Sequence, residues 1–525
     1  MQVNALKEPL PPAQGEPARP GSQGGQPDRL GLLGGILLLL LVTVLVRLPY
    51  FCHPVIDWDE STYILIGQSI LDGHLPKTVL VDVKPPSACV PYAFFILLFG
   101  RSIAAVRLGG LACVFVASVC IYLTCRRRFG MLGALMAGIS VIVFTTIDQC
   151  LGATMLEHIA LVPLACVALI WPTGSLTPRR GFLIGLLVGL ASALKTNLAG
   201  FLLAPLALTL FTLKGRRTKR ALSVILLLIL GCGLPMLSQL LAYALLGKLD
   251  LLWHTSIVGA SRYASAHLAE SSRLASLVPS LGQQFKYMNK AGFLLAWLVP
   301  FCGLLVALTG KGRYERKRSF VAVMAVFSLA GFLTIVAAGT LGQRHCYIVL
   351  VPFTAAISGY VFQFCLASRM WALASLSTCC ALFLALQPVY SEYTYAWKTA
   401  VRKKGSDTAY KVADYLRSKQ VKGQYVYFNC LHIGYWLLDA RIPTRIAHPS
   451  GMWTRSAVQA LSGPASTPTH ELELLFQKRP LYVVTYLKQP QLPERLEFLS
   501  KLGAELQVNY VLEKQIDGVG IFRRR

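Results

Sequence analysis

The sequence predicts a polytopic α-helical membrane protein that ends in a small α/β domain. Hydrophobic residues make up 54% of the 525 residues and charged residues only 14%, and the mean hydropathy is +0.55. Apolar runs of roughly 17 to 25 residues, long enough to cross a bilayer, recur through the first three quarters of the chain. This combination excludes an ordinary soluble globular protein.

Short blocks of basic residues between the apolar runs predict the topology. The formal net charge of +27 is also typical of nucleic-acid binding, but the blocks do not follow one amphipathic face, so we expect no nucleic-acid partner. The positive-inside rule instead places every block in the cytoplasm. The blocks are Arg126-Arg127-Arg128, Arg179-Arg180, Lys214 to Arg220, Lys311 to Arg318, and Arg369.

About eleven spans and a cytoplasmic N-terminus satisfy that rule. We expect them near Leu30–Val46, Ile103–Cys125, Met131–Ile147, Met155–Trp171, Gly181–Leu194, Leu198–Leu213, Ala221–Leu246, Ala291–Leu308, Phe320–Ala338, Cys346–Cys365 and Trp371–Leu386. The apolar run Val90–Phe99 is too short to span, so it is expected to lie at the membrane surface. Counting it as a span would invert the later basic blocks.

This topology divides the chain into three parts. Residues 1–29 are rich in Pro, Gly and Gln and are expected to form a disordered cytoplasmic tail. Residues 30–386 form the transmembrane module with a first outer loop at 47–102, and residues 387–525 form an extracytoplasmic α/β domain. In that domain we expect a helix near Asp407–Ser418 and strands near Tyr425–Phe428, Tyr482–Tyr486, Val508–Leu512 and Val519–Phe522. It carries no Gly-rich phosphate loop and no nucleophile elbow, so we expect no chemistry there.

Charged residues gather in the first outer loop, where Asp57-Trp58-Asp59-Glu60 precedes Asp82-Val83-Lys84-Pro85-Pro86. An ionised carboxylate near Asp59 could accept a proton from a hydroxyl, whereas the alternative for Asp59 and Glu60 is a solvated loop or a helix N-cap. Lys84 could pair with a phosphate, and the prolines after it fix the backbone. Its alternative is an extended side chain that reaches the lipid headgroups.

Further charged residues are predicted on the same outer face. Glu157 opens the fourth span and Asp148 lies in the loop before it; ionisable groups at membrane depth cost about 2.5 to 3.5 kcal/mol and tend to be functional, although helix capping is the alternative for Glu157. Arg107 and Arg344 could bind phosphate oxygens, and Lys195 could bind phosphate or anchor to headgroups. His345 could equally bond a loop carbonyl. The 14 cysteines show no metal-ligand spacing.

These motifs resemble the membrane glycosyltransferases of the GT-C fold, related to protein O-mannosyltransferases and to the bacterial aminoarabinose transferase that modifies lipid A. The most specific matches are Trp58-Asp59-Glu60 with Tyr63, and Asp82-x-Lys84-Pro85-Pro86. Arg107, Glu157, Leu194-Lys195, Arg344-His345 before Pro352, and Gly434-Tyr435-Trp436 with Arg441-Ile442-Pro443-Thr444-Arg445 support them. Val83 replaces a glutamate of the aminoarabinose enzyme and Cys346 replaces an expected tyrosine.

The resemblance implies an inverting hexosyl- or pentosyltransferase that moves a sugar from a polyprenyl-phosphate donor to a lipid, glycan or protein acceptor at the outer face of the membrane. It implies Asp59 as base, with Glu60 and Glu157 as further catalytic acidic residues. Lys84, Arg107, Lys195, Arg344 and His345 would bind the donor phosphate, and the further candidates are Asp57, Asp82, Asp148 and Tyr63. It implies no firm cofactor and no metal ligands, while allowing a divalent cation.

Two other classes use charges at a membrane surface: a transporter or flippase of a lipid-linked sugar, and a noncatalytic envelope subunit. Transporters usually show internal repeats and interrupted helices near the midplane, which this sequence does not show clearly. The chain also lacks an Asn-x-Ser/Thr sequon, which favours a bacterial inner membrane over the endoplasmic reticulum.

Overall fold

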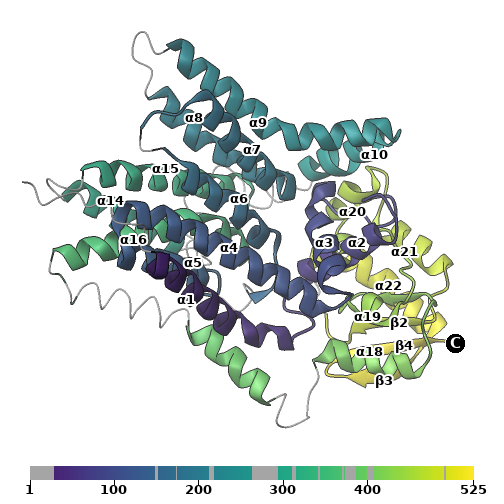
Figure 1. Cartoon of the computed structure of the whole chain (residues 1–525). Helices are drawn as coiled ribbons and strands as arrows, with labels where there is room; N and C mark the ends of the chain where they lie inside the picture. Colours follow the sequence, from purple (N-terminus) through teal and green to yellow (C-terminus); the bar gives the residue numbers. More distant parts are fainter. Residues whose placement is uncertain are drawn as a thin grey trace, which may run out of the picture.

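The computed structural model describes residues 29–147, 152–172, 174–211, 218–262, 294–309, 315–340, 343–368, 370, 372, 386–398, 407–489 and 492–525. Figure 1 shows a large helical part, with the C-terminal residues forming a smaller domain on one side of it. The expected tail, Asp148 and most of the expected span Trp371–Leu386 lie outside the described residues.

Long apolar helices make this an integral membrane protein. Five helices among the described residues are long and apolar enough to cross a bilayer: Arg29–Cys52, Ile103–Phe129, Thr218–Leu245, Ser319–Ala337 and Arg344–Ala367. The main helices are α1 (Arg29–Arg47), α4 (Ile103–Phe129), α5 (Met131–Phe144), α6 (Leu156–Ile170), α7 (Pro178–Leu194), α8 (Leu203–Leu210), α9 (Thr218–Leu245), α10 (Leu249–Leu252), α14 (Val299–Thr309), α15 (Glu315–Ala337) and α16 (Val351–Ala367).

Several of the eleven expected spans take a shorter or composite form in the structure. The expected span Leu198–Leu213 is a 3₁₀ helix, η4 (Thr196–Leu202), followed by the eight residues of α8. The expected surface segment Val90–Phe99 is a separate helix, α3, of ten residues. The tighter winding of η4 places Gly200 against Thr334 of α15, where a Cβ on Gly200 would lie 2.4 Å from the Thr334 hydroxyl.

Close helix contacts in the membrane part depend on small residues. A Cβ on Gly185 of α7 would lie 2.2 Å from the carbonyl oxygen of Leu228 on α9. Glycine therefore lets the two backbones approach each other, which is a common way of packing helices in a lipid environment.

The helix α2 (Trp58–Leu71) lies between the membrane helices and the C-terminal domain (Figure 1). All residues from Glu60 to Gly67 are buried, which explains why the helix has no polar face. Tyr63 packs on Tyr92 of α3. The same apolar core includes Val412 and Phe428 of the C-terminal domain, so the two parts share one core around α2.

The C-terminal domain is built on a four-stranded mixed sheet in the order β1-β2-β4-β3. Its strands are β1 (Val426–Phe428), β2 (Tyr482–Tyr486), β3 (Tyr510–Ile516) and β4 (Val519–Arg524). β1 and β2 are parallel, and both other pairings are antiparallel. The domain's helices are α18 (Thr408–Ser418), α19 (Gly434–Leu438), α20 (Arg455–Ser462), α21 (Pro468–Gln477) and α22 (Leu496–Asn509).

The expected strand start at Val508 is wrong, because α22 continues to Asn509 and β3 begins at Tyr510. The turn between β3 and β4 is Asp517-Gly518, with φ of 47° and 81°. Aspartate and glycine tolerate this left-handed conformation, which suits a tight hairpin.

Polar contacts fix the domain on the segment between α1 and α4. Val81 pairs with Ile446 as a short parallel bridge, in which the Val81 N–H donates to the Arg445 carbonyl over 2.7 Å. The Thr62 hydroxyl lies 2.9 Å from Nε2 of His432, and the Trp436 indole donates to the Gln68 side chain over 3.1 Å. These contacts orient the segment after Ile446 toward the start of α2.

Candidate active site

One cavity of about 1090 Å³ is lined by five of the predicted charged site residues: Asp57, Asp59, Lys84, Lys195 and His345. The polar part of its lining includes Asp57, Asp59, Lys84, Lys195, Asn197, His345, His448 and Ser450. The apolar part includes Leu203, Ile257, Leu333, Val336, Ala337 and Ala338. The side chains Leu203 and Leu333 are 55% and 48% exposed, so the cavity continues onto an apolar outer surface.

The start of α2 positions the two aspartates. Asp57 is the N-cap, and its Oδ1 accepts from the Asp59 N–H over 2.8 Å. Asp59 lies in the first turn, and its Oδ2 accepts from the Tyr63 hydroxyl one turn later over 3.1 Å. The capping role that the sequence left open therefore falls to Asp57, and Asp59 faces the cavity.

The surroundings of the cavity shift the pKa values of Asp57 and Asp59 in opposite directions. Burial and the neighbouring Asp59 raise the pKa of Asp57. Burial also acts to raise the pKa of Asp59, but the ammonium of Lys84, the nearby imidazoles of His448 and His345 and the bond from Tyr63 hold it well below its usual range. Asp59 is thus an ionised carboxylate, ready to accept a proton or to face a cation.

The Val81–Ile446 bridge brings two distant residues to the same cavity. Lys84 follows Val81 by three residues and His448 follows Ile446 by two, and both line the cavity. The Nε2 atom of His448 lies 3.5 Å from Oδ1 of Asp59. The C-terminal domain therefore contributes directly to the surroundings of the carboxylate.

The backbone fixes the tautomer of His448. Its Nδ1 accepts from the Ser450 N–H over 3.2 Å at the start of the 3₁₀ helix η10 (Pro449–Met452). An Nδ1 that accepts a bond carries no proton in the neutral ring, so the proton is on Nε2, which faces Asp59.

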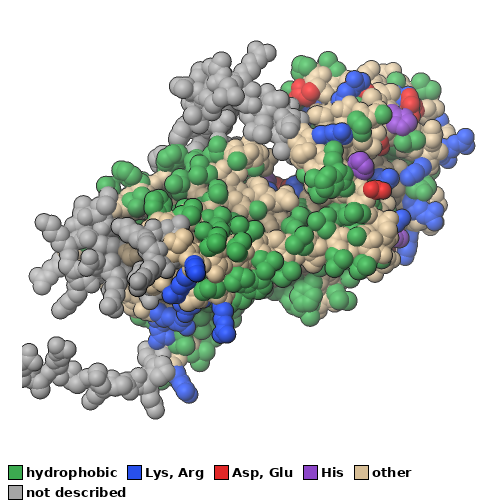
Figure 2. Space-filling view, turned by 90° about the horizontal axis from the view of Figure 1, so that it is seen from above, with side chains coloured by type: hydrophobic (Ala, Val, Ile, Leu, Met, Phe, Trp, Pro, Cys, Tyr) green, Lys and Arg blue, Asp and Glu red, His purple; other side chains and the backbone are tan. Residues whose placement is uncertain are grey.

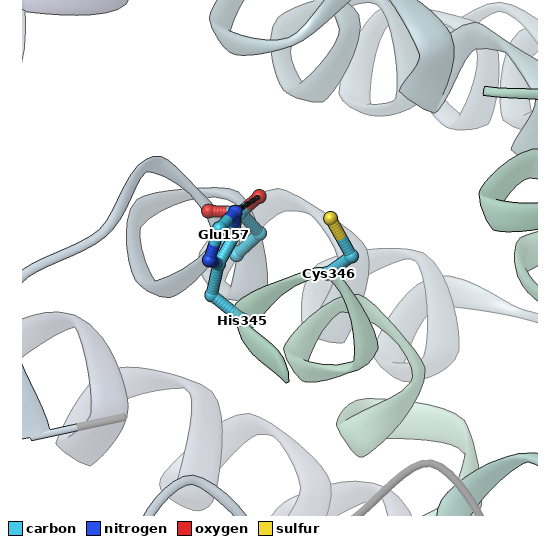
Figure 3. A group of neighbouring side chains, drawn as sticks. All are labelled: Glu157, His345 and Cys346. Atoms are coloured by element: carbon cyan, nitrogen blue, oxygen red, sulfur yellow. Dashed lines mark ion pairs between the residues drawn. The ribbon is translucent and has the colours of Figure 1, made fainter. Parts of the chain in front are cut away.

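A second cluster holds Lys195 and His345 at the cavity wall. Lys195 ends α7, and its Nζ donates to Oε1 of Glu157 over 2.5 Å. His345 Nε2 lies 3.9 Å from the same carboxylate. Figure 3 shows the Glu157 and His345 side chains facing each other, with Cys346 next to them. Glu157 is only 2% exposed and does not line the cavity, so it orients the two residues that do.

Glu157, His345 and Cys346 also form a group with metal-ligand atoms. Their oxygen, nitrogen and sulfur atoms lie within 4.8 Å of one another, a donor set that zinc accepts. However, Lys195 Nζ lies 3.2 Å from Cys346 Sγ as well as 2.5 Å from Glu157. The ammonium already supplies the positive charge at this point, so these residues fit a metal ion only if Lys195 moves away.

Glu60 and Arg107 lie together but away from the cavity. Oε2 of Glu60 accepts from Arg107 over 2.5 Å, and both side chains are 1% exposed. Oε1 of Glu60 accepts from the Thr154 N–H over 2.5 Å, and Arg107 also donates to the Tyr50 carbonyl over 3.3 Å. Neither residue lines the cavity, so we assign them a structural role in place of the expected catalytic and phosphate-binding roles.

Two further candidates are placed elsewhere. Asp82 accepts from its neighbour's N–H through Oδ1 and lines a small pocket with Lys77 and Lys84. Arg344 is exposed at the start of the 3₁₀ helix η9 (Arg344–Leu350) and does not line the cavity.

Comparison with known proteins finds a matching family model and a similar solved structure. Residues 83–243 match the family model described as dolichyl-phosphate-mannose-protein mannosyltransferase. The structure is similar to that of ArnT from Cupriavidus metallidurans bound to undecaprenyl phosphate, with a TM-score of 0.56 and 13% identity over 93% of this chain and 98% of that one. The fold is that of the GT-C glycosyltransferases.

An Archaeoglobus fulgidus oligosaccharyltransferase, crystallised as a complex with zinc and sulfate, is a weaker match. Its TM-score is 0.44 at 13% identity, over 86% of this chain and 68% of that one. Comparison with curated protein sequences gave no match.

Sequence reasoning missed His448 and Ser450. Both come from a domain in which we expected no chemistry, and they reach the cavity only through the bridge between Val81 and Ile446. The motif ending at Arg445 was the only signal near them, and it gave no reason to choose a histidine three residues later.

The structural role of the buried pair is testable. Glu60→Ala leaves Arg107 as a buried unpaired charge, so we expect a stability loss of about 3–5 kcal/mol, measured as thermal unfolding of the purified protein in detergent. The matched control is Asp439→Asn, which removes the exposed partner of Arg101 and should cost at most about 1 kcal/mol. A stable Glu60→Ala protein that has lost only activity would instead give Glu60 a catalytic role.

Proposed function

We propose that this protein is an inverting glycosyltransferase that moves a sugar from a polyprenyl-phosphate donor to a hydroxyl group of a lipid, glycan or protein. The observation that carries the proposal is that Asp59, two lysines and two histidines line the same cavity as a set of apolar side chains. A polyprenyl-phosphate sugar has the same division, with an apolar chain, an anionic phosphate and a polar sugar.

The apolar part of the lining suits the polyprenyl chain. Leu203, Ile257 and Leu333 line the cavity and are also partly exposed on the outer surface. Apolar chain atoms that leave water for such a lining are stabilised by about 0.8 kcal/mol per CH₂ group. The fold match to ArnT supports this choice, because that protein was crystallised with undecaprenyl phosphate. The description of the matching family, which names a dolichyl-phosphate sugar, also supports it.

The cations of the polar part of the lining suit the phosphate. Lys84 and Lys195 reach the cavity from the outer loop and from the end of α7, with His345 beside Lys195. When the bond between the sugar and the phosphate oxygen breaks, negative charge develops on the leaving phosphate. Fixed positive charges at that point stabilise the transition state more than the ground state.

Asp59 is the proposed base. The acceptor hydroxyl attacks the anomeric carbon from the face opposite the phosphate and transfers its proton to the carboxylate, which inverts the configuration at that carbon. Tyr63 and the cap at Asp57 hold the carboxylate in place. We place this cavity at the outer face of the membrane, because the basic blocks Arg126–Arg128 and Arg179-Arg180 lie at the opposite helix ends.

Replacing the base tests the proposal directly. In liposomes supplied with a panel of polyprenyl-phosphate hexoses and pentoses and an envelope extract, Asp59→Asn should lower kcat by about 10²–10⁴-fold, because general-base catalysis contributes that much. Mass spectrometry of the glycosylated product is the measurement. Asp72→Asn, which changes the exposed C-cap of the same helix, should keep full activity. If the wild-type protein forms no product but moves the donor across the membrane, it is a flippase.

Lys84 is expected to act on both the donor and the base. Lys84→Met should raise the donor KM about tenfold or more, because one fixed cation facing the phosphate is lost. It should also move the acid limb of the pH–rate profile to higher pH, since Lys84 is the strongest of the charges that lower the pKa of Asp59. An unchanged KM together with an unchanged acid limb would place Lys84 outside the site.

His448 can be tested with two complementary substitutions. His448→Asn keeps an acceptor for the Ser450 N–H but loses the group facing Asp59, so kcat should fall roughly tenfold, as for a lost hydrogen bond to a charged group. His448→Gln extends an amide N–H toward Asp59 and should recover part of kcat, although it loses the cap and about 1 kcal/mol of stability. Full activity in His448→Asn would show that this contact is dispensable.

A further inference from the structure

A second hollow, of about 580 Å³, lies far from the active-site cavity. Its basic lining consists of Arg127, Arg128 and Arg180, and its remaining lining is apolar or aromatic, including Leu169, Trp171 and Leu183. We call it the arginine groove. None of its lining residues also lines the active-site cavity.

The groove lies at the opposite end of the helices that build the active site. α6 begins next to Glu157 and ends at the groove with Ile170, whereas α7 begins there and ends beside Lys195. α4 carries Arg107 in its second turn and Arg127 near its end. At 1.5 Å per residue these 20 residues correspond to roughly 30 Å, about the thickness of the hydrocarbon core of a bilayer.

The lining of the groove carries three arginines and no carboxylate. No Asp or Glu is among its lining residues, and among the described residues no carboxylate pairs with Arg127 or Arg180, both of which are exposed. In Figure 2 the basic side chains visible at the helical end have no acidic side chain among them.

Arg128 forms a fixed part of the groove. Its guanidinium donates to the carbonyls of Thr124 and Trp171, each over 2.9 Å, and its Cζ lies 4.2 Å from the Phe320 ring centroid. A guanidinium held in this way keeps its orientation and presents its charge to the groove at little further entropic cost.

We propose that the arginine groove binds the phosphate headgroup of an anionic phospholipid in the leaflet opposite the active-site cavity. Arginine recognises phosphate oxygens with paired N–H donors. The apolar lining, which includes the exposed Leu183, suits the glycerol and first acyl carbons. Basic pockets between transmembrane helices bind such headgroups.

The competing explanation is that these arginines only set topology. Two exposed basic residues at the same helical end separate the explanations: Arg29 begins α1, and Lys219 lies in the first turn of α9. Neither residue lines the groove. Arg29 and Lys219 contribute to topology as Arg127 and Arg180 do, and removing them takes away the same charge, so they are matched controls.

The experiment is lipid titration of the purified full chain in a neutral detergent, followed by native mass spectrometry with phosphatidylglycerol and with phosphatidylcholine. We expect phosphatidylglycerol to bind the wild type with a clear preference. The double variant Arg127→Gln with Arg180→Gln should lose that affinity roughly 25-fold, about fivefold for each cation. The control Arg29→Gln with Lys219→Gln should change it less than twofold, and thermal unfolding of each variant reports its folding.

Three results would overturn the proposal. If the control variant loses as much affinity for phosphatidylglycerol as the groove variant, then the affinity follows the total charge of the protein and not the groove. Equal binding of phosphatidylcholine would mean that the apolar lining alone selects the lipid. Displacement of phosphatidylglycerol by millimolar inorganic phosphate would mean that the groove takes a soluble phosphate.

Discussion

The buried ion pair between Glu60 and Arg107 is the constraint on which the candidate active site depends. Two fully buried charges are tolerated only when each is compensated, and Glu60 reaches this state by binding both Arg107 of α4 and the Thr154 N–H. These two contacts hold α2 in a single position relative to the membrane helices. Asp59 precedes Glu60 by a single residue, so its place at the cavity follows from the ion pair.

Helix geometry explains why two adjacent carboxylates have different roles. Successive residues of an α-helix point about 100° apart, so Asp59 and Glu60 cannot both face the cavity. The sequence identified the acidic group but could not assign its members, because the partner of Glu60 lies 47 residues away. The bond from Tyr63 to Asp59 was more accessible to prediction, since residues four apart share one helix face.

The parts of the fold that the sequence predicted well carry local signals. Apolar runs indicated the membrane helices, and alternating β-branched and aromatic residues indicated β2 and β4. Segments with mixed signals were harder to predict. The sequence suggested one span where the structure has η4 and α8, although Gly200 and Pro205 favour a break there. It also suggested a strand from Val508, where α22 continues to Asn509. His448 had no local signal, because its place depends on pairing between residues 365 positions apart.

The two ends of the helical part also differ in how their positive charges are balanced. In the active-site cavity Lys195 is paired with Glu157, and Lys84 faces Asp59. In the proposed reaction, a phosphate that leaves after each transfer should be stabilised without being retained, and partly neutralised cations meet both needs. In the arginine groove no carboxylate lies among the lining residues. A groove without that competition favours lasting occupancy over turnover, which is why we assign it a resident lipid and not a second substrate.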